Sequence, residues 1–324
     1  MRRAAKVINF GIIYGMSAFG LARELGVGQR EAQEYIDSYF ERHRAVREFM
    51  DGVIEEARTK GFVRTLLGRM RFIPELVNSD PAVRQLVEID ARYVPAPAGE
   101  HSLYIRPFMI ASEAFLGVRA AEEVTFLVIA SPVGPYFANG VQGVDIWVTD
   151  EWARAGQGGT GNAKCGGNYA ASLIAQYEGY EHGCTQVMFI EATGKDRVEE
   201  LGGMNVFLIS KDNELVTPAL SGTILDGITR DSILKVGAEQ GLTPVERRLS
   251  AQEVFDGIAD GTYTEAFCCG TAAVISPISG FKSKRGEWRP QGQDFRRTIE
   301  IRDGVLDIQY GRAEDTFGWL SKVV

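Results

Sequence analysis

The stretch GQGGTGNAKCGGNYAAS, residues 156–172, decides the fold of this chain. It carries a lone lysine, Lys164, in a backbone with few side chains, where a bulky planar group could come close. A glycine-rich run beside a lysine first suggests a P-loop, but that motif needs GxxxxGK(S/T), with the lysine next to the glycine. Here two residues separate Gly161 from Lys164, and a cysteine follows. The P-loop is excluded, which leaves a solvated loop lysine or a lysine that binds a ligand.

Segments on both sides of this stretch alternate between strand-like and helical patterns. Runs rich in β-branched and aromatic residues predict strands at 103–111, 124–130, 144–149, 186–192 and 205–210. Apolar spacing predicts helices at 169–180, 229–240 and 251–258. KDNELVTP is predicted to form a tight turn between paired strands, with Asp212 and Asn213 at its tip. Residues 85–324 are therefore expected to form a mixed α/β domain.

The first 76 residues differ from the rest of the chain in their apolar pattern, which predicts almost only helix. Apolar residues recur at helical spacing from Glu31 to Ala57, with a bend expected near His43. After Gly61 the segment FVRTLLGRMRFIP is expected to form a small hairpin or a loop. Residues 1–76 carry a net charge of +3, whereas residues 77–324 carry −11. This change of sign predicts two segments with different partners.

Length and composition exclude several classes of protein. The chain has 324 residues, of which 45% are hydrophobic and 24% charged, as in soluble proteins of about two domains. Its apolar runs are too short for a membrane span, and its start shows no signal peptide. Four cysteines and three histidines show no CxxC and no zinc spacing. We expect no metal site, and reduced thiols in the cytoplasm.

The lysine segment TGNAKCGGNYAAS resembles that of fold type IV pyridoxal-phosphate enzymes, specifically branched-chain amino acid aminotransferases. The resemblance covers about residues 84–324 and continues collinearly in SLYIRPFMIASE (102–113), SPVGPYFANG (131–140), EELGGMNVFL (199–208), LSGTILDGITRDSIL (220–234) and CGTAAVISP (269–277). It implies the large domain of that fold, a mixed sheet or pseudo-barrel with helices. It also implies pyridoxal 5'-phosphate as cofactor, and transamination between branched-chain amino acids and 2-oxoglutarate by a homodimer.

The resemblance assigns roles at the cofactor. Lys164 matches the lysine that binds it covalently and then moves a proton. Glu200 matches the carboxylate that keeps the pyridine nitrogen protonated, so that the ring can accept electrons. Tyr169 matches the tyrosine that hydrogen-bonds the phenolic oxygen. The alternatives are a solvated acid beside Glu199 and a helix-packing tyrosine.

Phosphate binding is expected where the helix over 229–240 starts, because exposed amides and the helix dipole favour an anion there. The resemblance gives this role to Ile228 and Thr229, with Thr271 completing the site. The amides of Thr271 and Ala272 match those that hold the substrate carboxylate. A plain N-cap role for Thr229 is the alternative, and the two roles are compatible.

Three further residues, Tyr104, Arg106 and Tyr136, match the substrate side of the site. An arginine buried in a strand is costly without an anionic partner, which favours a functional interpretation of Arg106. Some family members carry a redox CxxC after the GTA turn. Ala273 and Ser276 stand at those positions, so no such thiol switch is expected.

The start of the chain, RRAAKVINFGIIYGMSAFGLARELG, resembles a different family, the fingers helix of family A DNA polymerases. Arg2, Lys6, Phe10 and Tyr14 stand four apart on one helical face. In that family the cations grip the incoming triphosphate and the aromatic residues stack on the base. Polymerase activity is not expected, because the palm aspartates that hold two Mg²⁺ ions are absent. Weak nucleotide or DNA binding is the alternative.

We expect residues 77–84 to join the helical segment 1–76 to the aminotransferase-like domain 85–324. Only the last helix of the family's small N-terminal domain is expected, within VRQLVEIDARYVP (83–95). Three hypotheses stay open: an aminotransferase of doubtful turnover, a nucleic-acid-binding remnant, and a non-functional chimera prone to aggregate through an exposed face. Other fold type IV enzymes, D-amino acid aminotransferases or aminodeoxychorismate lyase, fit the lysine alone, but IRPFMIASE and GGMNVF favour the branched-chain group.

Overall fold

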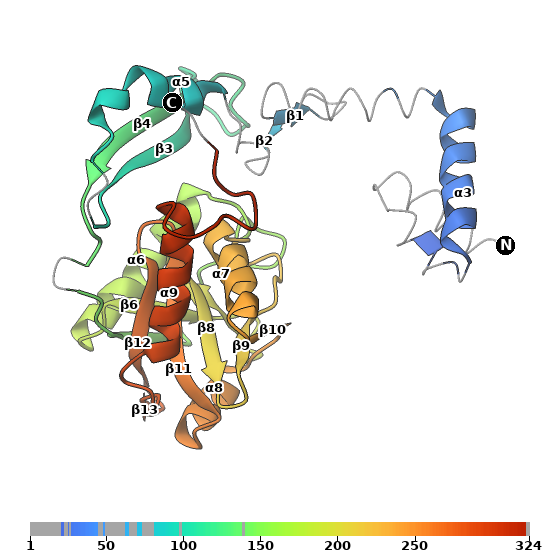
Figure 1. The fold of residues 1–324 in the computed structure, drawn as a ribbon. Coiled ribbons are helices and arrows are strands. Elements are labelled where there is room, and N and C mark those ends of the chain that lie inside the picture. The colour runs from blue at the N-terminus through green and yellow to red at the C-terminus, as the bar shows by residue number, and fades with distance from the viewer. Residues whose placement is uncertain are drawn as a thin grey trace. The chain divides into compact units, whose positions relative to one another are not determined.

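The computed structural model describes residues 21–22, 25, 27–44, 48, 62–64, 70–72, 81–96, 99–137 and 140–321 (Figure 1). The chain divides into two compact units. The first comprises Met1–Arg92 and Ile105–Ile129, and the second comprises Tyr93–Tyr104 and Ala130–Lys322. Among the described residues, no helix is long and apolar enough to cross a bilayer.

A nine-stranded mixed sheet forms the second unit, in the order β10-β9-β8-β11-β12-β5-β6-β7, with β13 beside β12. The pairs β10–β9, β12–β5 and β5–β6 are parallel, and the other pairs are antiparallel. The strands are β5 Val144–Thr149, β6 Gln186–Ile190, β7 Val198–Leu201, β8 Asn205–Ser210, β9 Glu214–Pro218, β10 Thr243–Arg247, β11 Tyr263–Gly270, β12 Val274–Ser283 and β13 Gly286–Trp288.

Helices cover both faces of the central strands. They are α6 Gly166–Glu181, α7 Ile228–Glu239, α8 Ala251–Ala259 and α9 Arg296–Gln309. Phe207 and Ile209 of β8 belong to the core cluster that includes residues of α7 and α9, which lie side by side in Figure 1. Val206 and Leu208 belong to the cluster that includes residues of α8. A strand that is buried on both faces has a continuous run of apolar residues in its sequence. This explains the sequence NVFLIS of β8.

The α/β expectation for this part of the chain is confirmed. Strands β5 and β8 have the predicted bounds, and β6 ends two residues earlier than predicted. The turn after β8 carries Asn213 at its tip with φ of 61°, a left-handed conformation that asparagine tolerates. Helices α6, α7 and α8 lie within three residues of their predicted bounds.

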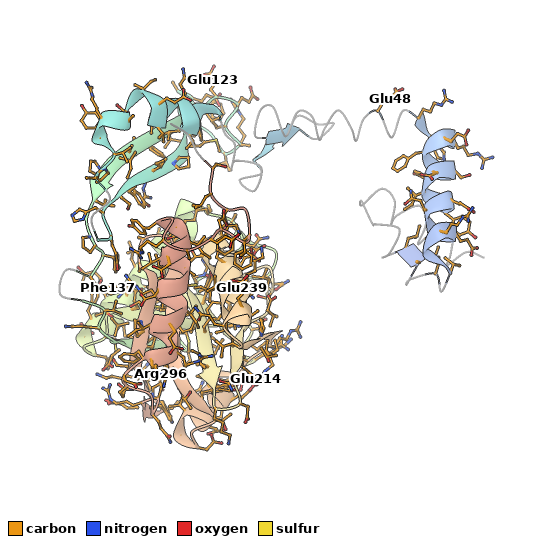
Figure 2. The ribbon with its side chains drawn as sticks, viewed as in Figure 1. Glu48, Glu123, Phe137, Glu214, Glu239 and Arg296 are labelled. Carbon is orange, nitrogen blue, oxygen red and sulfur yellow. The ribbon has the colours of Figure 1, made fainter. Side chains whose placement is uncertain are left out.

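Helix α9 holds the segment around residue 100 against the sheet unit. Arg302 is 4% exposed and its Nη2 lies 2.7 Å from Oε2 of Glu100. Its guanidinium carbon also lies 5.9 Å from the ring centroid of Phe137, which Figure 2 labels. A buried guanidinium needs an anionic partner, so this ion pair fixes Glu100 in place.

Two strands, β3 Ser102–Ala111 and β4 Val124–Val133, pair with each other in a separate small sheet. They are preceded by α5 Pro81–Ile89 and the 3₁₀ turn η2 Ala91–Tyr93. The helix expected within residues 83–95 is therefore present. The domain boundary expected at 77–84 stays a prediction.

In the first unit, α3 Gln29–Arg42 ends at the bend expected near His43. Its Ala32 packs with Leu21 and Ala22 in a small buried cluster. Strands β1 Phe62–Arg64 and β2 Met70–Phe72 form an antiparallel pair. This hairpin is one of the two outcomes expected for the segment after Gly61, and the expectation that residues 1–76 are almost entirely helical stays a prediction. Arg2, Lys6, Phe10 and Tyr14 lie outside the described residues.

Candidate active site

Lys164 lies in the loop between β5 and α6, directly before Cys165, the N-cap residue of α6. Its Nζ is 5.1 Å from the ring centroid of Tyr169, in the first turns of the helix. The loop is held by buried Asn168, whose Nδ2 donates to the carbonyl oxygens of Thr160 at 2.7 Å and Ala163 at 3.0 Å. The lysine side chain is exposed, but the backbone that carries it is fixed.

Glu200 lies on β7, at an irregularity in its pairing with β6. Met188 pairs with Leu201 and Ile190 pairs with Val198, so one residue of β6 faces two residues of β7. Those two residues are Glu199 and Glu200. A β-bulge of this kind re-aims side chains and is frequent next to active sites. Both glutamates are only 3% exposed, so the alternative of a solvated acid is wrong.

Three groups hold the carboxylate of Glu200. Its Oε1 lies 2.5 Å from Nη2 of Arg154 and accepts from the backbone N–H of Leu225 at 2.8 Å. Its Oε2 accepts from Nδ2 of Asn205 at 3.0 Å. Burial raises the pKa of Glu200 to about 7, against the opposing effects of Arg154, the Leu225 amide and the charge of Lys164. A cationic ligand atom at this carboxylate would favour its charged form.

The start of α7 lies beside this carboxylate. Its N-cap residue is Gly227, which makes no side-chain cap, so the first amides of the helix have no side-chain acceptor. A Cβ on Gly227 would collide with Oδ1 of Asn205, the residue that donates to Glu200. Thr229 is the second residue of the helix, so the plain N-cap role for it is wrong. The uncapped amides of Ile228 and Thr229 form a site that suits an anion.

The turn between β7 and β8 lies between Tyr169 and the turn that joins β11 to β12. A Cβ added to Gly203 would lie 3.7 Å from Cε1 of Tyr169, and one added to Gly270 would lie 3.6 Å from the carbonyl oxygen of Gly203. Gly270 ends β11 directly before Thr271 and Ala272, which are exposed. The structure thus gathers at one end of β7, β8 and β11 the predicted residues Lys164, Tyr169, Glu200, Ile228, Thr229, Thr271 and Ala272.

The three predicted substrate-side residues lie on or next to the β3–β4 pair. Tyr104 and Arg106 lie on β3, and Tyr136 follows β4 and is 56% exposed. Arg106 is exposed rather than buried, so the argument from a buried arginine was wrong. Their roles stay predictions.

Sequence reasoning missed Arg154, Asn168 and Asn205. Asn168 and Asn205 stand inside motifs that were quoted, GGNYAAS and GGMNVF, and a buried asparagine beside a site lysine or glutamate could have been singled out. Arg154 gives no such signal, because its partner Glu200 is distant in sequence.

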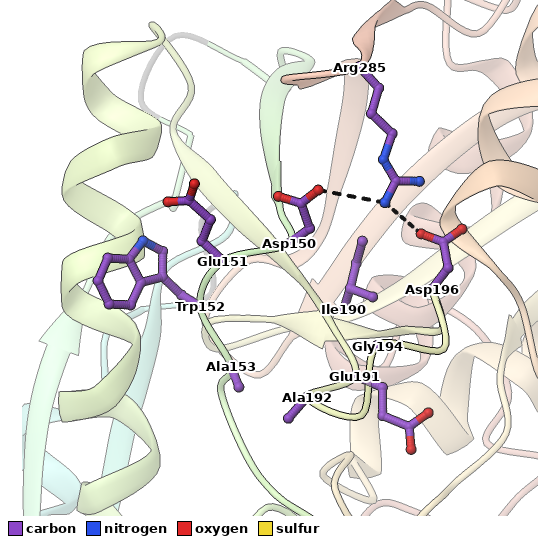
Figure 3. Close-up of a pocket in the computed structure, with 10 residues that line it drawn as sticks. All are labelled: Asp150, Glu151, Trp152, Ala153, Ile190, Glu191, Ala192, Gly194, Asp196 and Arg285. Atoms are coloured by element: carbon purple, nitrogen blue, oxygen red, sulfur yellow. Dashed lines mark ion pairs between the residues drawn. The ribbon is translucent and has the colours of Figure 1, made fainter.

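A cavity of about 290 Å³ lies between the segments that follow β5 and β6 (Figure 3). Arg285 pairs there with Asp196 at 2.7 Å and with Asp150 at 3.7 Å. In Figure 3 the carboxylate of Glu191 points away from these ion pairs. None of the residues gathered around Lys164 lines this cavity, so it is not part of the candidate site.

Comparison with known proteins finds two family models. The description "Amino-transferase class IV" matches residues 81–281, and "DNA polymerase family A" matches residues 1–96. The chain is 43% identical over 297 residues to a branched-chain-amino-acid aminotransferase of Mycolicibacterium smegmatis, covering 89% of this chain and 80% of the relative. It is 49% identical over 236 residues to a probable branched-chain-amino-acid aminotransferase of Streptomyces coelicolor, covering 72% and 65%.

Solved structures with the same fold include the branched-chain amino acid aminotransferase of Escherichia coli. Its TM-score is 0.62 at 28% identity, covering 86% of this chain and 84% of that one. The T.th. branched-chain amino acid aminotransferase with pyridoxamine 5'-phosphate has a TM-score of 0.64 at 26% identity, covering 78% and 77%. The expected fold of the α/β part is therefore confirmed.

Proposed function

Because the chain belongs to the class IV aminotransferase family, we propose that it transfers amino groups between branched-chain amino acids and 2-oxoglutarate, with pyridoxal 5'-phosphate as its cofactor. The observation that carries this proposal is the buried carboxylate of Glu200, held by Arg154, Asn205 and Leu225. The charge of Lys164 opposes the rise in the pKa of the same carboxylate, which supports a site that includes both the amine and the acid.

The residues present fit this cofactor. Gly203 lies beside Tyr169, where an added Cβ would be 3.7 Å from Cε1 of the ring, and Gly270 lies beside Gly203, where an added Cβ would be 3.6 Å from its carbonyl oxygen. The uncapped start of α7 suits a phosphate group, and the buried acid suits a protonated ring nitrogen. When bound, pyridoxal phosphate supplies a carbonyl carbon that takes up the amino group and a ring that accepts electrons.

Lys164 would hold the cofactor through Nζ and afterwards carry a proton to and from the substrate carbon. Tyr169, whose ring centroid is 5.1 Å from Nζ, would donate its hydroxyl proton to the cofactor's phenolic oxygen.

Glu200 would accept a hydrogen bond from the protonated ring nitrogen. A cationic partner lowers the pKa of a carboxyl, so the contact reverses the effect of burial and keeps Glu200 charged. Arg154 and Asn205 orient the carboxylate, because each donates to one of its two oxygens. An acid fixed in this way keeps the ring nitrogen protonated.

The phosphate would lie at the start of α7. The first-turn amides of Ile228 and Thr229 face no side-chain cap, and the helix dipole adds partial positive charge there. The hydroxyl groups of Thr229 and Thr271 would donate further hydrogen bonds. The amides of Thr271 and Ala272 would hold the substrate carboxylate, and Tyr104, Arg106 and Tyr136 would lie on the substrate side of the site.

A homodimer would cover the apolar face of α6. Four apolar residues on this helix are more than half exposed: Leu173, Ile174, Tyr177 and Tyr180. Contiguous exposed apolar residues mark an interaction surface. Light scattering of the purified chain is expected to give the mass of a dimer, and a monomer would contradict this part of the proposal. The four free cysteines suit the reducing cytoplasm.

A nucleotide-binding function of the first segment is not favoured. It rests on the family A polymerase match and on Arg2, Lys6, Phe10 and Tyr14, which lie outside the described residues.

Glutamate formation from L-leucine and 2-oxoglutarate, measured with added pyridoxal phosphate, tests the activity. The wild-type chain is expected to form glutamate and Lys164→Ala is not, whereas Lys235→Ala, on the exposed surface of α7, keeps the wild-type rate. A wild-type chain that binds cofactor and forms no glutamate would overturn the proposed reaction.

A further inference from the structure

Glu199 is a buried acid to which the proposed function gives no role. It stands beside Glu200 on β7, where two residues of this strand face one residue of β6. Each of the two glutamates is only 3% exposed. Burial of two adjacent acids is costly unless opposite charge or hydrogen-bond donors compensate both of them. The second acid therefore needs a compensating group as much as the first.

One guanidinium group serves both acids. Arg154 is 4% exposed, and its Nη2 lies 2.5 Å from Oε1 of Glu200. Burial raises the pKa of Glu199, and the Thr223 hydroxyl and the charge of Arg154 oppose this rise. The carbonyl oxygen of Thr223 also accepts a hydrogen bond from Nη2 of Arg154. Arg154, Thr223 and the two acids therefore form one buried group.

The charges of this buried group do not cancel. With both acids ionised, one positive charge on Arg154 stands against two negative charges, on Glu199 and Glu200, so the net charge is −1. Two further charges act on these acids: that of Lys164, which is exposed, and that of Glu191, which is bound in an ion pair of its own. A net charge of −1 is matched by the single positive charge of a protonated ring nitrogen.

We propose that Glu199 is a positioning residue, which offsets the charge of Arg154 so that Glu200 still attracts a proton to the cofactor's ring nitrogen. An arginine in a buried one-to-one pair would neutralise Glu200 and weaken this attraction. With Glu199 present, Arg154 still orients Glu200, while its charge is shared between two acids. This role rests on the proposed function, because it requires Glu200 to face the ring nitrogen.

Titration of Glu200 in the cofactor-free full chain tests this role. NMR of a chain that carries isotope-labelled glutamate follows the carboxyl group, and Glu200→Gln identifies its signal. Burial is the main cause that raises this pKa, and the charge of Glu199 adds to it. Because Glu199→Gln removes the charge and nearly keeps the shape, the acid dissociation constant of Glu200 is expected to rise about tenfold. An unchanged constant would overturn the proposal.

Two control variants separate the charge of Glu199 from its structural contribution. Glu199→Asp retains the charge and is expected to keep the dissociation constant of Glu200 close to that of the wild type. Glu287→Gln, which removes an exposed acid on β13, is expected to leave it unchanged. Equal shifts in Glu199→Gln and Glu199→Asp would show that shape and not charge matters, which would contradict the proposal.

The chain loaded with pyridoxal phosphate gives a second measurement. The NMR chemical shift of an isotope-labelled ring nitrogen reports whether it carries a proton. Glu199→Gln is expected to lose this proton about one pH unit below the wild type. If Glu199→Gln fails to fold, titration of Glu199 in the wild type decides, with its signal identified by Glu199→Asp. A Glu199 that keeps its proton at neutral pH would overturn the proposal. Failure to take up cofactor would contradict the proposed function alone, because the titrations of the cofactor-free chain do not require it.

Discussion

Nη2 of Arg154 lies 2.5 Å from Oε1 of Glu200, and both side chains are almost wholly buried. Arg154 also donates to two carbonyl oxygens, that of Gly161 at 2.8 Å and that of Thr223. The arginine therefore ties the glycine-rich loop before Lys164 to the loop before α7. A buried ion pair is sustained where further hydrogen bonds satisfy its partners. Here both oxygens of Glu200 and Nη2 of Arg154 have such bonds, whereas Nε of Arg154 has no hydrogen-bond partner among the described residues.

Arg154→Gln is expected to destabilise the chain by about 3–5 kcal/mol, because removal of one partner leaves a buried charge unpaired. Urea unfolding followed by circular dichroism measures the free energy of unfolding. The control is Arg296→Gln, since Arg296 is 76% exposed in its pair with Glu300, and such surface pairs contribute about 0–1 kcal/mol. A loss for Arg154→Gln no larger than for the control would contradict the structural role of the pair.

The stability of the cofactor-free chain is expected to depend on pH through Glu200. Its pKa is raised in the folded state from 4.5 to about 7, so between these values the folded chain binds more protons than the unfolded chain. The contribution is fully present below pH 4.5 and is lost as the pH rises towards 7. The difference in unfolding free energy between wild type and Glu200→Gln should therefore change across this window. A difference that is constant with pH would contradict the raised pKa.

Gly227→Ala is expected to weaken cofactor binding and to cost about 1–3 kcal/mol of stability, because the new methyl group would collide with Asn205 Oδ1. Asn205 would then lose its bonds to Glu200 and to the Leu225 carbonyl. The φ of Gly227 is −79°, so lack of space and not backbone strain is the cause. Gly156→Ala, where nothing lies within 4 Å of the added methyl group, is the control. Equal cofactor affinity in the two variants would argue against this geometry.

The sequence predicted the strands whose apolar runs are short and continuous. β5 and β8 have their predicted bounds, because strands buried on both faces leave that pattern. β7, with the sequence VEEL, was not predicted, since two adjacent glutamates do not indicate a buried strand. The burial of Glu200 depends on Arg154 and Asn205, which only folding brings near. The charged helix α9 was missed for a similar reason, although Ile301 and Val305 bury one face of it.

The residues of the candidate site that lie in recognised sequence motifs were predicted. Lys164, Tyr169 and Glu200 came from segments that resemble known ones, and the structure brings them together. The N-cap of α7 was misplaced, because Thr229 is a favoured cap residue and Gly227 gives a weaker signal.

The most direct test of the account is the attachment point of the cofactor. The full chain is incubated with pyridoxal phosphate, reduced with borohydride, digested, and mapped by mass spectrometry. The account predicts a pyridoxyl group on Lys164, its loss in Lys164→Ala and its persistence in Lys235→Ala. A label absent from Lys164, or unchanged in amount when Lys164 is replaced, would contradict the central claim.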